Sequence, residues 1–113
     1  MKRIFAILVV ALLLLCSLCA CNSNRVQVLT DSMSPTFRAG DWVTYEEVDP
    51  ATLKIGDVIV FEKTDGSVNV HRIVEIKSSE TGELLFVTKA DAVATPDSDP
   101  VTADQIIGRA VAK

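Results

Sequence analysis

The chain has 113 residues, the length of one ordinary domain. It carries 11 basic and 15 acidic side chains, and without Lys2 and Arg3 the balance is 9 against 15. This acidic character argues against nucleic-acid binding, which needs a basic face, and equally against a polybasic membrane patch.

The N-terminal 21 residues have the layout of a secretory targeting segment. Lys2 and Arg3 precede an apolar run that extends from residue 4 to residue 20 and contains a single polar residue, Ser17. Leu18-Cys19-Ala20-Cys21 resembles a lipobox in which Cys21 is lipidated, and an uncleaved signal anchor, an N-terminal hydrophobic helix, fits equally well. We therefore expect residues 1–21 to be a lipoprotein signal or an anchor. Either one would tether residues 22–113 at the membrane, outside the cytoplasm.

Residues 22–113 have the pattern of an all-β domain, because no apolar stripe with a helical period occurs there. Turn signals at 64–67 and 79–82 separate β-branched and aromatic runs. The polar segment 91–104, with two prolines, is typical of a loop. The predicted strands cover residues 25–29, 41–48, 58–61, 68–76, 84–89 and 105–112.

Cysteine and histidine usage argues against a structural disulfide framework and against zinc. The three cysteines lie in or just after the apolar run, and His71 is the single histidine. A domain of this size also buries about two-thirds of its unfolded surface without such support. No cofactor or metal is expected.

Three local features could carry chemistry, although each has an ordinary structural explanation. Ser32 lies in Ser32-Met33-Ser34-Pro35-Thr36 after the first predicted strand, and by itself this is a common Ser/Pro turn. His71 lies within a strand, where a lone histidine is usually structural. Asp91 follows Lys89-Ala90 at a strand end, as in a solvated turn. Together they supply a nucleophile, a base and a group that orients the base.

The order and the sequences of these segments resemble those of the signal peptidase I family. Gly40-Asp41 and Gly56-Asp57 look like the family's paired strand openings, and His71-Arg72-Ile73 lies where the family has its base. The other matching segments are the nucleophile box Ser32-Met33-Ser34-Pro35-Thr36, Thr88-Lys89-Ala90-Asp91-Ala92 and Ile106-Ile107-Gly108-Arg109-Ala110. With a histidine in the position of the base, the chain resembles the branch of the family that includes the endoplasmic-reticulum and archaeal enzymes and some bacterial ones.

The resemblance implies a small β-sheet or barrel catalytic domain that cleaves secreted preproteins after small residues, typically Ala-x-Ala. It implies Ser32 as nucleophile and His71 as general base. Asp91 would orient or stabilise His71, and Asp97 matches a second acidic position found in this branch. It further implies oxyanion binding by the Ser32 N–H with help from Thr30, and substrate contacts at Met33 and Pro35.

Three residues depart from the family pattern: Asp31, Ala90 and Val93. Ala90 replaces a glycine, so its backbone is expected to have a negative φ. These departures keep two alternatives open. One is a catalytically degenerate β-domain lipoprotein that binds a partner, and the other is a specialised processing peptidase with one or two clients.

Overall fold

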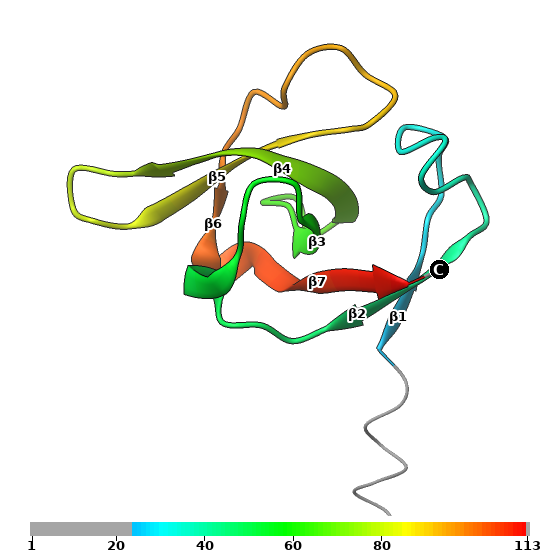
Figure 1. The fold of residues 1–113 in the computed structure, drawn as a ribbon, viewed down its shortest axis with the longest axis horizontal. Coiled ribbons are helices and arrows are strands. Elements are labelled where there is room, and N and C mark those ends of the chain that lie inside the picture. The colour runs from blue at the N-terminus through cyan, green and yellow to red at the C-terminus, as the bar shows by residue number, and fades with distance from the viewer. Residues whose placement is uncertain (1–23, 113) are drawn as a thin grey trace, which may run out of the picture.

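The structure, a computed structural model, describes residues 24–112, and these residues form a strongly curled antiparallel sheet (Figure 1). Two single turns of 3-10 helix, η1 (Pro50–Thr52) and η2 (Ala103–Gln105), interrupt the strands. The strands are β1 (Arg25–Gln27), β2 (Trp42–Glu46), β3 (Val58–Glu62), β4 (Val68–Ser78), β5 (Leu84–Lys89), β6 (Val101–Thr102) and β7 (Ile106–Ala112).

The strand order is β1-β2-β7-β3-β4-β5-β6, and every neighbouring pair is antiparallel. The last long strand, β7, is therefore inserted between β2 and β3, so the C-terminal end of the described chain lies in the middle of the sheet. Long β4 pairs with β3 on one side and with β5 on the other. The strand that carries His71 is therefore hydrogen-bonded to a neighbouring strand along both of its edges.

The sheet is buried on both faces, which explains the continuous apolar sequence of β3. Successive β3 side chains point to opposite faces: Val58 and Val60 enter one cluster, whereas Ile59 and Phe61 enter the other. The first cluster contains Val28, Met33, Phe37, Val43, Val58, Val60, Val70 and Ala90. The second contains Leu53, Ile59, Phe61, Ile73, Phe86 and Val101.

The all-β prediction is confirmed, and all six predicted strands are present with small differences in their bounds. The segment 91–104 was expected to be a loop, but it contains the two-residue strand β6 and η2. Val101 is buried beside Phe86, its partner in β5, and this tertiary contact draws the short segment into the sheet.

The targeting segment predicted at 1–21 lies outside the described residues. Between residues 24 and 112 no helix has the length and apolar character needed to cross a bilayer.

Candidate active site

Ser32 lies in the loop between β1 and β2, and two buried side chains that follow it anchor this loop. Met33 is 1% exposed and Phe37 is 7% exposed, and both belong to the first core cluster. The loop is also tied to the segment after β5, because the Ala92 N–H donates to the Ser32 carbonyl oxygen over 2.8 Å. The backbone at half-buried Ser32 is therefore held by the packing of Met33 and Phe37 and by the hydrogen bond from Ala92.

The Thr30 hydroxyl lies directly against Ser32. Thr30 Oγ1 donates to Ser32 Oγ over 3.0 Å, and the Ser32 backbone N–H points at the same Thr30 oxygen over 3.4 Å. The predicted proximity of Thr30 to the nucleophile is thus present. A hydroxyl in this position can shift its hydrogen bond from Ser32 Oγ to an oxyanion that forms beside the Ser32 N–H.

His71 is held by Asp97. Its Nδ1 lies 2.6 Å from Asp97 Oδ2, and the same carboxylate oxygen accepts a 2.6 Å hydrogen bond from Thr88 Oγ1. Thr88 is fully buried in β5, and its carbonyl oxygen accepts from the Asp97 N–H over 2.8 Å. The Phe61 ring meets the imidazole edge-on. With Nδ1–H donating to Asp97, Nε2 keeps its lone pair free to accept a proton.

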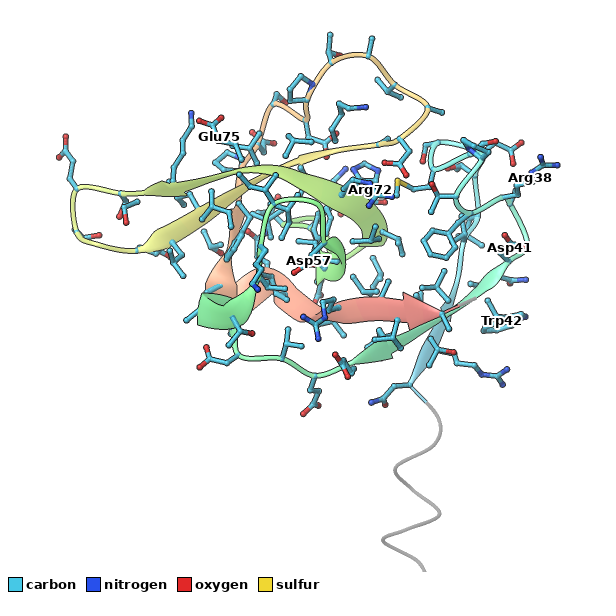
Figure 2. All side chains as sticks on the ribbon, in the orientation of Figure 1. Arg38, Asp41, Trp42, Asp57, Arg72 and Glu75 are labelled. Carbon is cyan, nitrogen blue, oxygen red and sulfur yellow. The ribbon has the colours of Figure 1, made fainter. Side chains whose placement is uncertain are left out.

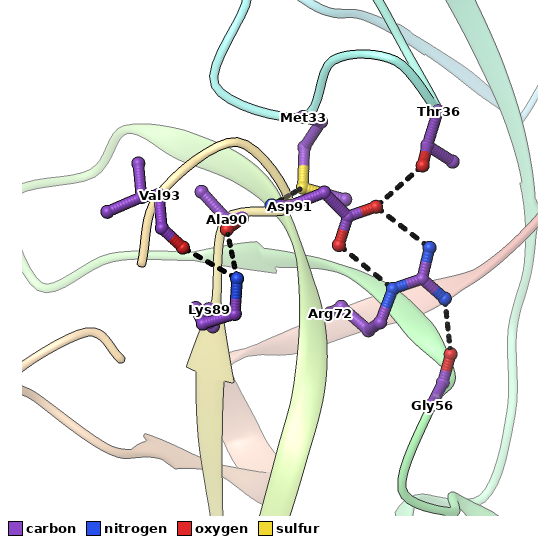
Figure 3. A network of polar contacts seen from close by, with 8 residues as sticks. All are labelled: Met33, Thr36, Gly56, Arg72, Lys89, Ala90, Asp91 and Val93. Atoms are coloured by element: carbon purple, nitrogen blue, oxygen red, sulfur yellow. Dashed lines mark hydrogen bonds and ion pairs between the residues drawn. The ribbon is translucent and has the colours of Figure 1, made fainter. Parts of the chain in front are cut away.

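Asp91 does not contact His71, contrary to the expectation that it orients the base. Its carboxylate instead forms a bidentate ion pair with Arg72, with Nε–Oδ1 and Nη2–Oδ2 distances of 2.9 Å each. Asp91 Oδ2 also accepts a 2.6 Å hydrogen bond from Thr36 Oγ1, and the Asp91 N–H donates to Met33 Sδ (Figure 3). Asp91 thereby joins β4 to the Ser32 loop.

Asp91 and Asp97 lie on opposite faces of the sheet because side chains alternate along a strand. His71 and Arg72 are neighbours in β4, so their side chains leave opposite faces of the sheet. Thr88 faces Ile73 across the β4–β5 pair, on the His71 face, and it brings Asp97 to that face. Figure 2 shows Arg72 on β4, and Asp91 meets it on the other face. There Arg72 Nη1 also donates to the Gly56 carbonyl oxygen (Figure 3).

The Arg72 ion pair also shifts the pKa values of both partners. The Arg72 guanidinium, followed by the Thr36 hydroxyl, lowers the pKa of Asp91 below its ordinary value, although partial burial opposes this effect. The Asp91 carboxylate correspondingly raises the pKa of Arg72. Both shifts favour the charged forms of the pair, which suits a structural role.

Ser32 and His71 line one cavity of about 220 Å³, which we call the Ser32 cavity. Its walls are the 26–30 segment that continues β1 and the 67–71 segment that begins β4, and Met33 also lines it. A second cavity of about 260 Å³, the Asp97 cavity, is lined by His71, Asp97 and the 97–101 loop. Exposed Pro35, predicted to contact substrate, lines neither cavity.

The three departures from the family pattern have local structural roles. Asp31 Oδ1 accepts a hydrogen bond from the Ala39 N–H within the Ser32 loop. Ala90 is buried and does not have a positive φ, as expected for a residue that replaces glycine. The Val93 carbonyl oxygen accepts from Lys89 Nζ over 2.6 Å, which closes the turn after β5 (Figure 3).

Sequence reasoning missed Thr88 and Arg72, which position the two acids. The alternation of side chains along a strand could have indicated Arg72, because it places Arg72 on the opposite face of the sheet from His71. Thr88 gave a weaker signal, as a lone hydroxyl in an otherwise apolar strand.

Comparison with known proteins assigns the chain to a family. Residues 1–80 match the family model described as signal peptidase, peptidase S26. The chain is 39% identical over 80 residues to signal peptidase I W of Bacillus subtilis (strain 168), covering 70% of this chain and 42% of the relative. It is 30% identical over 71 residues to signal peptidase complex catalytic subunit SEC11C of Homo sapiens, covering 62% and 37%.

The corresponding subunit sec11 of Dictyostelium discoideum is 32% identical over 97 residues, covering 79% of this chain and 54% of the relative. The chain thus spans about half the length, or less, of these curated relatives. The matched family model covers Ser32 and His71, the two residues that line the Ser32 cavity together. By sequence match and by the resemblance already seen in its motifs, the chain belongs to the signal peptidase family, peptidase S26.

Proposed function

We propose that this chain is a membrane-tethered serine endopeptidase that removes signal peptides from secreted preproteins by cutting after small residues of the Ala-x-Ala type. The observation that carries the proposal is the presence of Ser32 and His71 in one cavity, with His71 Nδ1 bonded to Asp97. Membership of the signal peptidase family supports it.

In the proposed reaction, Ser32 Oγ attacks the scissile carbonyl carbon while His71 Nε2 takes the hydroxyl proton. His71 then gives this proton to the leaving amine as the C–N bond breaks, which leaves an acyl-enzyme. A water molecule attacks the acyl carbon with His71 again as base, and Ser32 is regenerated. Asp97 holds the imidazole and stabilises its charged form at each step, because its carboxylate lies on the opposite ring nitrogen.

The oxyanion formed in both steps would accept hydrogen bonds from the Ser32 N–H and the Thr30 hydroxyl. The Thr30 oxygen already lies 3.0 Å from Ser32 Oγ, so it needs only a small rotation to reach the new charge. One such donor contributes about 3–4 kcal/mol to transition-state stabilisation in other hydrolases.

The walls of the Ser32 cavity suit an extended peptide. The 26–30 segment continues the edge strand β1, and apolar side chains such as Val26, Val28 and Val70 line the space between it and β4. Edge strands offer unpaired backbone groups, so the substrate chain would bind by strand addition while small side chains fill shallow apolar subsites.

The dyad is tested by Ser32→Ala and His71→Ala in the full chain with an Ala-x-Ala peptide and detergent micelles. Each variant is expected to reduce kcat/KM by at least about 10³-fold, and the double variant to be little worse, because the two residues act as a unit. Ser34→Ala is the matched control, since it makes the same change in the same loop without lining the cavity. Full activity in either single variant would show that the dyad is wrong, and an inactive wild type that still binds peptide would favour the degenerate lipoprotein.

The tether is proposed from residues 1–21. If Cys21 is lipidated, Cys21→Ser is expected to abolish metabolic labelling with a fatty acid, whereas Cys16→Ser is expected to leave it intact. An intact N-terminus from Met1 in the membrane fraction, identified by mass spectrometry, would establish the anchor instead.

A further inference from the structure

Two side chains, Asn69 and His71, separate the Ser32 cavity from the Asp97 cavity. They are the residues common to the linings of the two cavities. Both belong to β4 and lie two positions apart, so their side chains leave the same face of the strand. Asn69 therefore lies beside the proposed base, between the Ser32 cavity and the Asp97 cavity.

The Asn69 amide has no hydrogen-bond partner within residues 24–112. The other amide side chains at these cavities are engaged: Gln27 Nε2 donates to the Gly40 carbonyl oxygen, and Gln105 Nε2 donates to the Glu62 carbonyl oxygen. Asn69 is half-buried, and much of the Ser32 cavity around it is apolar. An unused donor and acceptor thus face a space that a peptide would fill.

We infer that Asn69 is a specificity-determining residue, which favours substrates with a hydroxyl or amide side chain within about three residues of the scissile bond. This inference rests on the proposed function. Two residues along β4 span about 7 Å, which is also the rise of two residues in an extended substrate. Val26 and Ser67 line the Ser32 cavity together with Ser32 and His71, so the cavity has room for substrate residues next to the scissile bond.

The preference arises because a bound substrate removes water from the Asn69 amide. A threonine side chain can replace the lost water hydrogen bond, whereas the isosteric valine leaves the amide unsatisfied. Sites with a buried hydrogen-bonding group discriminate strongly against substrates that lack the matching group. A Thr peptide is therefore expected to be cleaved about tenfold faster than its Val partner at that one position.

The test uses fluorescent Ala-x-Ala peptides in Thr/Val pairs, with the pair placed in turn at each of three positions before and after the scissile bond. The ratio of kcat/KM for the two peptides is measured for wild type, Asn69→Leu and Asn69→Val. We expect a ratio near ten at one position in wild type and near one in both variants. Asn24→Leu is the matched control, since this exposed asparagine lines neither cavity, and the wild-type ratio is expected to persist.

The ratio distinguishes specificity from a structural role, because a general loss of order at β4 would slow both peptides alike. A ratio that is near one at every position in wild type, or that is unchanged in both Asn69 variants, would overturn the inference. If wild type cleaves no peptide, the proposed function fails, and fluorescence anisotropy of the same peptides then decides the matter. Tighter Thr binding that is lost in Asn69→Leu would support the inference, and equal or absent binding would overturn it.

Discussion

Replacement of Asp97 is the most direct test of the geometry at His71. Asp97 Oδ2 is the shared acceptor of two 2.6 Å hydrogen bonds, one from His71 Nδ1 and one from Thr88 Oγ1. In Asp97→Ala the imidazole loses the partner that fixes its tautomer, and the proposed base is no longer held with Nε2 free. In Asp97→Asn one acceptor oxygen remains but the charge that stabilises the imidazolium is lost.

The expected size of the effect follows from the role of the orienting acid in other hydrolases. Loss of such an acid lowers turnover by about 10⁴-fold, less than loss of the nucleophile. Asp97 is one-third exposed, so solvent can partly replace it, and we expect a 10²- to 10⁴-fold decrease in kcat/KM for Asp97→Ala. This corresponds to about 2.7–5.4 kcal/mol of transition-state stabilisation. Asp97→Ala also leaves the buried Thr88 hydroxyl without its acceptor, which costs about 1–3 kcal/mol of folding stability.

The assay is kcat/KM on one Ala-x-Ala peptide, measured beside thermal unfolding for each variant at a temperature well below every Tm. Asp97→Asn separates catalysis from stability, because it can keep the Thr88 hydrogen bond. Asp99→Ala is the control for loss of a carboxylate from the same loop, since Asp99 does not line the Ser32 cavity. Asp97 does not orient the base if Asp97→Ala keeps more than a third of wild-type activity, or if Asp91→Ala loses more activity than Asp97→Ala at unchanged Tm.

Two further predictions concern the framework. Gly108→Ala is expected to lower the free energy of unfolding by about 1–3 kcal/mol, measured by denaturant titration. The added Cβ would lie 2.5 Å from the Glu46 carbonyl oxygen and 2.6 Å from Tyr45 Cδ2, so one of these groups would have to move. An unchanged midpoint of unfolding would contradict this. Asp91→Asn is expected to lower Tm at pH 7, and this difference from wild type is expected to shrink as the pH falls below about 4. The Arg72 ion pair lowers the folded pKa of Asp91, so its stabilisation is present above the unfolded value near 3.9 and is lost as the pH falls through the folded pKa. A difference that stays constant from pH 7 to pH 2 would show that the ion pair does not contribute in this way.

The sequence by itself predicted the strands, because hydrophobic alternation and turn signals are local. The Thr64–Ser67 turn and the β-branched run of β3 lead to the β3–β4 hairpin with little influence from distant residues. The motif around Ser32 and the single His71 were equally readable, since each depends on a few consecutive residues or on composition. The negative φ expected at Ala90 is also confirmed, because the backbone preference of a non-glycine residue is a local property.

The short strand β6 and the acid that contacts His71 were decided by tertiary structure. β6 exists because Val101 is buried against Phe86, a contact between segments that local propensity cannot foresee. Asp91 ends a strand and looked well placed to orient His71, whereas Asp97 lay in a polar loop with Pro96 and Pro100. The pairing of Thr88 with Ile73 brings Asp97 to the His71 face, and Arg72 takes Asp91 on the other. Local sequence sets which side of its own strand a side chain occupies, but only the register between strands decides which distant carboxylate meets it.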